Sequence, residues 1–378
     1  MVVTPGQQRF QSPYGAVKLM RYPARTAESL LAWCSADALA LEEVHRRGIP
    51  ACDIAVVNDA FGALCVALQP SALWTDSALS VHALRQNERA NSRPATPVTW
   101  STDPPPSDAA TVVIRIPKQR AYFEYQLAEL ARCLSPGATV LAAGMDKHLS
   151  QHTAQILERY IGPTQRHAGQ SKARLFTAVR DNRPAPAAMQ VHASYYCSQL
   201  GSELRGLPNV FSRDKLDMGA RFLLEHLHTV AAAETVVDLA CGNGVLGLVA
   251  AKQGLAKHLV FCDESAMAIA SAGHNARQVL PEMAAAISFH HGDGLEHYEG
   301  PAPQLILCNP PFHQEHTVNE FAGQRLIEHC SRCLPSGGRL LLVANRHLNY
   351  LPLLHHSFAQ VERCAGNAKF TLFLAHKL

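Results

Sequence analysis

One stretch of the sequence decides the fold of this chain: LILCNPPF, residues 305–312. Its first four residues are apolar and predict the end of a buried strand. Asn309 comes next, followed by Pro310 and Pro311, which lack the backbone N–H that a central strand needs. Because a residue before a proline is pushed toward extended conformations, Asn309 and Pro310 are held stiffly. The stretch therefore predicts a rigid loop at the carboxyl end of a strand, where open α/β sheets bind their ligands.

The groups that this loop offers suit a planar exocyclic amine. The side chain of Asn309 and the carbonyl of Pro310 can each accept one N–H of such an amine. The ring of Phe312 can stack on the base that carries it. An ordinary turn is the alternative, since Asn-Pro is common in turns. The strand before it, the second proline and the aromatic ring favour a catalytic loop.

A glycine-rich turn lies upstream, after another apolar strand, in CGNGVLG, residues 241–247. The spacing of Gly242, Gly244 and Gly247 fits G-x-G-x-x-G, which also marks dinucleotide enzymes. The glycines let the backbone approach a cofactor closely. Asp238 precedes this turn, and its carboxylate is unsuited to a pyrophosphate but could pair with the ammonium of an amino-acid moiety. The turn therefore favours S-adenosylmethionine over a nicotinamide dinucleotide.

Two further acidic residues follow predicted strands. Asp263 lies 19 residues after Gly244, the right place for a carboxylate that accepts both ribose hydroxyls. Asp293 stands between Gly292 and Gly294, which predict a tight turn that exposes it. For each acid the alternative is an ordinary surface residue in a loop.

The order of elements repeats along the chain. The matching segments are 59–62 with 238–242, 114–118 with 307–311, 132–137 with 332–337 and, more loosely, 172–178 with 368–375. Chance similarity between two α/β halves is the alternative. The repeat predicts two tandem doubly wound, Rossmann-like domains, residues 1–181 and 190–378, joined by a linker at 182–189. The first copy lacks the glycine turn and the Asn-Pro-Pro run, so we expect it to be degenerate.

The run from Asn309 to Phe312 resembles the motif of methyltransferases that use S-adenosylmethionine to methylate amine or amide nitrogens. Extended to His313, and with the duplicated architecture, the chain is similar to the ribosomal RNA guanine-N2 methyltransferases. The similarity is strong in residues 205–348 and weak before 190. It implies a first domain that recognises RNA or supports the second. It also implies Asp293 near the adenine amine, and a segment at 211–214 lying against the site.

The candidate residues form two sets. The catalytic set is Asn309, Pro310, Pro311 and Phe312. The cofactor-binding set is Asp238, Gly242, Gly244, Asp263, Asp293 and Asn309. In the catalytic set, holding both amine hydrogens favours a pyramidal nitrogen whose lone pair points at the methyl group. Orientation and in-line approach supply the rest, without a strong general base.

Composition and charge limit the partners, the compartment and the metal sites that we expect for this chain. Residues 1–189 hold 20 Lys and Arg against 15 Asp and Glu, and the remainder holds 14 against 16. The more basic first half suits RNA docking, although a solvated surface gives the same excess. The sequence contains no uncharged apolar run of 18 residues, so we expect no membrane span. Eleven scattered cysteines suit reduced thiols in a cytoplasmic protein. The pairs Cys330/Cys333 and His313/His316 lack further ligands, so we expect no metal site.

Several functions stay open. The first is methylation of a guanine N2 in large-subunit (23S) ribosomal RNA, favoured by CGNG at 241–244 and FHQ at 312–314. Small-subunit (16S) ribosomal RNA is the runner-up. DNA adenine and protein glutamine share the chemistry, but the degenerate first copy speaks against them. A non-catalytic RNA-binding assembly factor conflicts with the intact Asn-Pro-Pro-Phe, and a nicotinamide oxidoreductase rests on glycine spacing alone.

Overall fold

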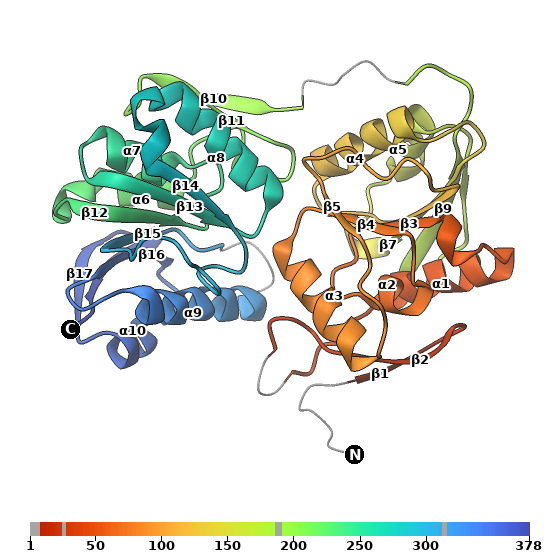
Figure 1. Ribbon diagram of the computed structural model, residues 1–378, viewed down its shortest axis with the longest axis horizontal. Helices are drawn as coiled ribbons and strands as arrows, with labels where there is room; N and C mark the ends of the chain where they lie inside the picture. The colour runs from red at the N-terminus through yellow and green to blue at the C-terminus, as the bar shows by residue number, and fades with distance from the viewer. Residues whose placement is uncertain (1–7, 25–27, 186–190, 312–315) are drawn as a thin grey trace. The chain divides into compact units, whose positions relative to one another are not determined.

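Residues 8–24, 28–185, 191–311 and 316–378 are described by a computed structural model of the chain. They form two units, Met1–Val191 and His192–Leu378. Each unit contains one seven-stranded sheet and a separate two-stranded hairpin. Figure 1 shows helices on both faces of each sheet, which is the layered arrangement predicted from the sequence.

The first unit begins with the hairpin β1 (Gln8–Ser12) and β2 (Gly15–Leu19). The sheet strands are β3 (Ile54–Val57), β4 (Ala72–Thr75), β5 (Val98–Trp100), β6 (Thr111–Arg115), β7 (Thr139–Met145), β8 (Thr164–Arg166) and β9 (Ala173–Val179). The helices are α1 (Ser35–Arg47), α2 (Ala63–Leu68), α3 (Ala78–Ala90), α4 (Arg120–Cys133) and α5 (Thr153–Tyr160), with 3-10 turns at Ala51–Asp53 and Asp146–His148. Helices α1 to α3 pack on one face of the sheet, and α4 and α5 pack on the other.

The second unit begins with the hairpin β10 (Ala193–Cys197) and β11 (Ser202–Gly206). The sheet strands are β12 (Ala233–Leu239), β13 (Ala256–Asp263), β14 (Ile287–His291), β15 (Leu305–Cys308), β16 (Arg339–Asn345), β17 (Gln360–Gly366) and β18 (Phe370–His376). The helices are α6 (Met218–Glu225), α7 (Val245–Lys252), α8 (Ala266–Val279), α9 (His316–Cys333) and α10 (Leu351–Ser357), with 3-10 turns at Leu227–Thr229 and Pro281–Ala286. One core joins α6, α7 and α8 to the sheet, and another joins α9 and α10 to its other face.

The two sheets have the same topology. Their strand orders are β5-β4-β3-β6-β7-β9-β8 and β14-β13-β12-β15-β16-β18-β17. In each sheet one strand, β9 or β18, runs antiparallel to both of its neighbours. The matching segments at 132–137 and 332–337 precede the equivalent strands β7 and β16. The predicted pair of tandem doubly wound domains is therefore confirmed.

Backbone conformation aligns the two copies residue by residue at the turn after the first sheet strand. Asn58 and Ala240 both have positive φ, +64° and +57°. Four residues later, Gly62 and Gly244 both precede a helix, with φ of +82° and +86°. Two left-handed residues at the same spacing fix which positions correspond, because side chains other than glycine rarely adopt this conformation.

This alignment corrects part of the predicted match. Val56, not Asp59, stands where Asp238 stands in the second unit. Arg115 is the residue that stands where Asn309 stands, one residue from the predicted position. The first copy therefore lacks both the buried carboxylate of the glycine turn and the amide of the catalytic loop, which confirms that it is degenerate.

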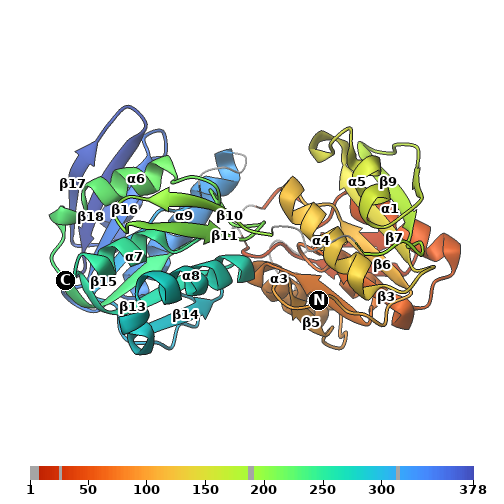
Figure 2. The ribbon, with the colours of Figure 1, turned by 90° about the horizontal axis from the view of Figure 1, so that it is seen from above.

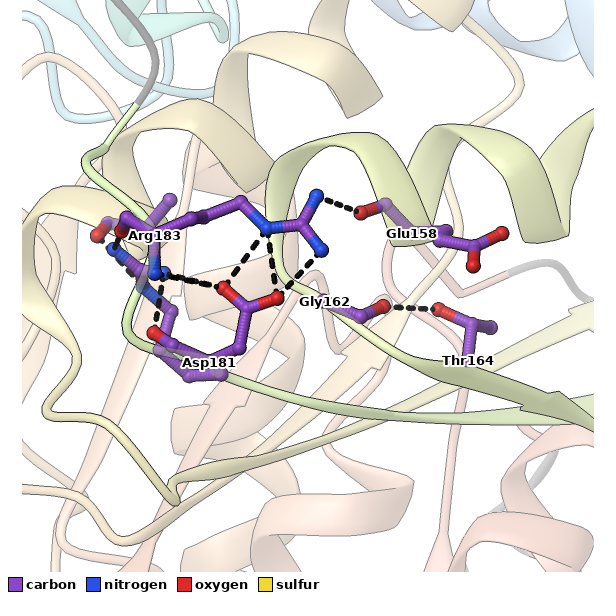
Figure 3. Close-up of polar contacts among 7 residues, drawn as sticks. Glu158, Gly162, Thr164, Asp181 and Arg183 are labelled. Carbon is purple, nitrogen blue, oxygen red and sulfur yellow. Dashed lines mark hydrogen bonds and ion pairs between the residues drawn. The ribbon is translucent and has the colours of Figure 1, made fainter.

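The residues that follow β9 remain bound to the first unit. The Arg183 guanidinium contacts the Asp181 carboxylate, with Nε at 2.7 and 2.9 Å from its two oxygens, and Nη1 donates to the Glu158 carbonyl at 2.9 Å (Figure 3). The Arg180 side chain in turn donates to the carbonyls of Ala131 and Arg183. The first residues of the segment predicted as a linker thus lie on the first unit, and the domain boundary stays a prediction.

Candidate active site of the second unit

The carboxyl ends of three parallel strands meet at one edge of the second sheet. Leu239 of β12 pairs with Cys262 of β13 and with Cys308 of β15. The glycine turn follows β12, Asp263 ends β13 and Asn309 follows β15. The structure therefore brings together, at this edge, the predicted residues Asp238, Gly242, Gly244, Asp263 and Asn309.

The glycine turn depends on conformations and contacts that side chains would disturb. Gly242 and Gly244 both have positive φ, +55° and +86°. A Cβ on Gly244 would lie 3.0 Å from the Phe261 ring and 3.1 Å from the Ala272 side chain. Helix α7 can therefore begin close against β13 and α8, with its N-terminal backbone facing the strand ends.

Asp238 is a buried carboxylate, and only one of its two oxygens accepts a hydrogen bond from a described residue. Its Oδ2 accepts the backbone N–H of Gly247 at 2.8 Å. Its Oδ1 is buried and has no hydrogen-bond partner among the described residues. Burial raises the pKa of this carboxyl to about 8; Asp263 adds to the increase and the Gly247 hydrogen bond opposes it. A buried acceptor without a partner points to a site that a donor or a cation completes.

Asp263 is held in one orientation by the loops on either side of it. Its Oδ2 accepts the N–H of Gly242 at 2.9 Å, and its Oδ1 accepts the N–H of Ser265 at 3.0 Å. Ser265 also caps α8 by accepting the N–H of Ala268. The carboxylate therefore links the glycine turn after β12 to the start of α8.

Asn309 has its amide oriented by a residue far away in sequence. Its Nδ2 donates to Asp217 Oδ2 at 3.0 Å. The same carboxylate oxygen caps α6 by accepting the N–H of Ala220 at 3.0 Å. Because an ionised carboxylate only accepts hydrogen bonds, the amide must turn its NH₂ toward Asp217. Asn309 Oδ1 is left buried without a partner in the described part of the chain.

Gly219 makes room for this arrangement. A Cβ at that position would lie 2.7 Å from Asn309 Oδ1. Asp217 thus serves both as the N-cap of α6 and as the partner of the Asn309 amide. The sequence pattern gave no sign of this contact, because nothing local relates two residues 92 positions apart.

The structure describes only part of the rest of the predicted catalytic loop. Pro310 is buried and Pro311 is exposed. Phe312 lies outside the described residues, as does the segment 313–315, so the stacking role of Phe312 stays a prediction.

Asp293 differs from its prediction. Its side chain is 3 % exposed, and its carboxylate forms an ion pair with Arg325 of α9. The expectation that the turn exposes Asp293 is therefore wrong, because α9 supplies an arginine that covers it. The glycine turn itself forms, with Gly294 at φ +56°. Nothing in the sequence around Arg325 indicated this pair.

The β10–β11 hairpin is tied to the site through α8. The side chain of Asn275 accepts the N–H of Arg205 and donates to its carbonyl, both at 2.9 Å. It also donates to the carbonyl of Asn243 in the glycine turn at 2.9 Å. The Asn243 side chain donates to the Tyr195 hydroxyl at 3.1 Å. The hairpin runs beside α8 in the second view of the ribbon (Figure 2) and braces the turn.

At the equivalent strand ends of the first unit, the polar side chains contact neighbours within the same unit. Arg115, which takes the position of Asn309, forms an ion pair with Asp37, and its Nη2 lies 3.3 Å from Cys34 Sγ. Asp59 is buried and accepts the N–H groups of three residues at the start of α2: Gly62, Leu64 and Cys65. In this unit the residues at the equivalent strand ends are thus engaged with neighbours of the same unit.

Within residues 8–24, 28–185, 191–311 and 316–378, no group of three or more His, Cys, Asp or Glu side chains could hold a metal ion. Among the described helices, none combines the length and the apolar character needed to cross a bilayer.

Known proteins resemble both units. Residues 7–182 match the RLMG N-terminal domain, and residues 201–374 match the methyltransferase small domain. Proteins named ribosomal RNA large subunit methyltransferase G from Pseudomonas aeruginosa and Stutzerimonas stutzeri are each 39% identical to this chain. The comparison covers 97% of the chain in both cases, and 99% and 98% of those proteins.

A solved structure shares the whole architecture. It is the T. thermophilus 16S rRNA N2 methyltransferase (RsmC) in complex with AdoMet and guanosine, with a TM-score of 0.76 and 20% identity over 98% of both chains. At this identity the likeness supports the tandem fold alone. The sequence relatives carry the assignment further, because they match along nearly their full length. The chain belongs to the family of ribosomal RNA large subunit methyltransferase G.

Proposed function

We propose that this chain transfers a methyl group from S-adenosylmethionine to the exocyclic N2 amine of a specific guanine in large-subunit (23S) ribosomal RNA. The observation that carries the proposal is the amide of Asn309, whose Nδ2 is held by Asp217 while its buried Oδ1 has no hydrogen-bond partner among the described residues. An acceptor fixed in this way suits an amine N–H. Membership of a large-subunit ribosomal RNA methyltransferase family supports the choice of substrate.

The residues at the strand ends fit the cofactor. Asp238 Oδ1 is a buried acceptor that can receive the ammonium of the amino-acid moiety, directly or through water. Gly242 and Gly244 have no side chains, so the backbone of the turn can approach the cofactor closely. Asp263, held by the N–H groups of Gly242 and Ser265, can accept the ribose hydroxyls. S-Adenosylmethionine supplies an electrophilic methyl group when bound.

The catalytic loop acts on the amine by holding it. Asn309 Oδ1 and the carbonyl of Pro310 accept its two hydrogens, which favours a pyramidal nitrogen with its lone pair directed at the methyl group. Phe312 stacks on the guanine. Because the loop follows β15 at the same edge as the glycine turn, orientation and in-line approach provide the main acceleration. The proton leaves late, to water, so the site needs no strong base.

The first unit, in this proposal, recognises or positions RNA and performs no chemistry. Its counterpart of Asn309 is Arg115, which is engaged with Asp37. Its half of the chain has 20 Lys and Arg against 15 Asp and Glu, which suits contacts with a polyanion. Exposing the guanine N2 in folded RNA requires displacing it from its pairing partner, and a second RNA-binding unit supports that step.

The test uses purified protein, labelled S-adenosylmethionine and RNA from cells that lack the protein. The 23S and 16S RNAs are offered separately, and the modified nucleoside is identified after digestion. N2-methylguanosine in the 23S RNA is the expected result. If neither naked RNA is labelled, assembled and partly assembled subunits are tried next. Absence of label there as well would overturn the assignment to ribosomal RNA.

The 16S RNA is the second candidate, because Asn309 Oδ1 and the Pro310 carbonyl would accept the two hydrogens of a guanine N2 amine in either RNA. N2-methylguanosine found only in the 16S RNA would keep the chemistry of the site and move the substrate to this candidate.

A further inference from the structure

A basic hollow opens at the edge of the second sheet, beside the catalytic loop. Its volume is about 420 Å³, and it is lined by Asn345, Arg346, His347, Ala368 and Lys369. Arg346 and Lys369 are exposed. Within the described ranges, no acidic side chain forms an ion pair with either of them. Two cations on a concave surface without acidic partners are suited to binding an anion.

The hollow is held together by the pairing of two antiparallel strands. Asn345, the last residue of β16, pairs with Phe370, the first residue of β18. The N–H of Arg346 donates to the carbonyl of Lys369 at 2.8 Å, which extends the ladder by one step. The two basic residues therefore extend from neighbouring strand ends whose relative position is fixed by the backbone.

The same ladder fixes where the hollow lies relative to Asn309. Strands β15 and β16 are parallel neighbours, with Cys308 opposite Leu342. Asn309 is thus level with Val343, and Arg346 lies three residues further out, about 10 Å along the strand direction. One nucleotide, from its base to a backbone phosphate, can span that separation.

A side-chain contact brings Lys369 toward the loop as well. Its Nζ lies 3.8 Å from the Sδ of Met218 at the start of α6. Met218 follows Asp217, whose carboxylate holds the Asn309 amide. The ammonium of Lys369 therefore borders the segment that orients the predicted catalytic residue.

The first unit keeps only the lysine of this pair. The equivalent ladder pairs Met145 with Ala173, and the N–H of Asp146 donates to the carbonyl of Lys172 at 2.8 Å, so Asp146 stands at the position of Arg346 and Lys172 at that of Lys369. Asp146 forms an ion pair with Arg174, with Nε at 3.1 Å from Oδ1. The degenerate copy thus has a neutralised acidic residue where the second unit has an arginine without an acidic partner.

We infer that Arg346 and Lys369 bind a backbone phosphate of the RNA substrate, next to the nucleotide that is methylated. The guanidinium fork and the ammonium both match a phosphodiester. Such a contact positions the substrate and carries no base specificity. The inference rests on the proposed function and adds a binding site for the RNA backbone to it.

The experiment compares RNA binding at several salt concentrations in the full-length protein. The test variant is Arg346→Gln with Lys369→Gln. A charge-keeping control is Arg346→Lys with Lys369→Arg. The matched neutral control is Lys252→Gln, because Lys252 is an exposed lysine at the end of α7, away from the strand ends that form the site. Dissociation constants for protein-free 23S RNA are measured by filter binding, and cofactor affinity is measured by titration.

We expect the test variant to bind RNA about tenfold more weakly at low salt, with unchanged cofactor affinity. The slope of log affinity against log salt should fall by about 0.7 for each lost contact with single-stranded RNA. The charge-keeping control should retain the slope of the unaltered protein. A test variant that binds like Lys252→Gln, with an unchanged slope, would reject the phosphate site alone. An unaltered protein that bound neither protein-free 23S RNA nor assembled or partly assembled subunits would overturn both this inference and the proposed function.

Discussion

At the scale of single residues, the orientation of the Asn309 amide is the feature on which the proposed chemistry depends. Replacing Asn309 with Ala removes the acceptor for the target amine and leaves the glycine turn and Asp263 in place. We expect methyl transfer to fall by a factor of about 100 or more, as when one polar contact to a reacting group is removed. Cofactor affinity, measured by titration calorimetry, should stay within a few-fold. Normal turnover in this variant would contradict the mechanism.

Asp217 offers a sharper test, because its two roles can be separated. In Asp217→Asn the helix cap survives, since Asn caps as well as Asp. The amide that replaces the carboxylate can still accept the Asn309 NH₂ through its oxygen, but it can also present its own NH₂, so the orientation of Asn309 is no longer fixed. We expect kcat to fall about tenfold while the melting temperature stays unchanged. A fall in stability without a change in kcat would assign Asp217 to capping alone.

Asp238 predicts an unusual response to pH. Burial raises the pKa of its carboxyl from 3.8 to about 8. Between these values the folded protein keeps a proton that the unfolded chain has lost, so stability of the cofactor-free protein falls as pH rises through this window. Each pKa unit corresponds to about 1.4 kcal/mol. Asp238→Asn should flatten this dependence, which thermal unfolding between pH 5 and 8 measures.

Cofactor binding should follow the opposite trend, because an ammonium ligand favours the ionised carboxylate. We expect affinity for S-adenosylmethionine to rise between pH 6 and 7.5 in the unaltered protein, by up to about tenfold per pH unit. The Asp238→Asn protein should bind more weakly and show little dependence on pH in that range. Equal, pH-independent affinities in both proteins would remove Asp238 from the cofactor site.

The sequence predicted the residues of this site better than it predicted their surroundings. Asp238, Asp263 and Asn309 stand out because each lies at or near the end of an apolar strand, and parallel strands bring their carboxyl ends together. The burial of Asp293 escaped prediction because its partner, Arg325, lies on a helix whose facing side chains the local pattern does not reveal. The Asp217 contact escaped for the same reason, since it depends on tertiary packing.

At the scale of elements, the start of α2 in the first unit depends on a single buried carboxylate. Asp59 accepts three backbone N–H groups there while fully buried. Removing the carboxylate in Asp59→Ala leaves those donors without a partner, at about 1–3 kcal/mol each in the worst case. We expect a loss of several kcal/mol of stability, seen as faster hydrogen exchange in α2 and β3. Cofactor affinity should not change, because the second unit provides that site.

The comparison of elements also explains which sequence matches failed. The segments at 132–137 and 332–337 aligned correctly, because a helix end, a turn and a strand start share one residue pattern. The glycine turn misaligned by three residues, since Asp59 resembles Asp238 in type but occupies a different place. Asp59 caps a helix from the loop, whereas Asp238 extends from within a strand. Residue identity without backbone conformation could not distinguish the two.

At the scale of the whole molecule, the two units should respond differently to the cofactor. Saturation at about 100 times Kd stabilises a binding unit by about 2.7 kcal/mol. We expect hydrogen exchange to slow in the second unit, in the turn after β12 and in α7, and to remain unchanged in the turn after β3. Mass spectrometry of peptides from the full-length chain separates the two. Protection in the first unit comparable to that in the second would mean that it also binds the cofactor.

The ion pair of Arg115 with Asp37 has a consequence for how such a duplicated protein can diverge. The side chain at this position is satisfied by its neighbours, within the same order of strands that the second unit has. The outer surface of that copy is then released from the demands of catalysis. It can vary until it fits a new shape, while its twin preserves the chemistry. A duplicated domain that performs no reaction can thus acquire a new binding surface without changing the residues of the active site in the other domain.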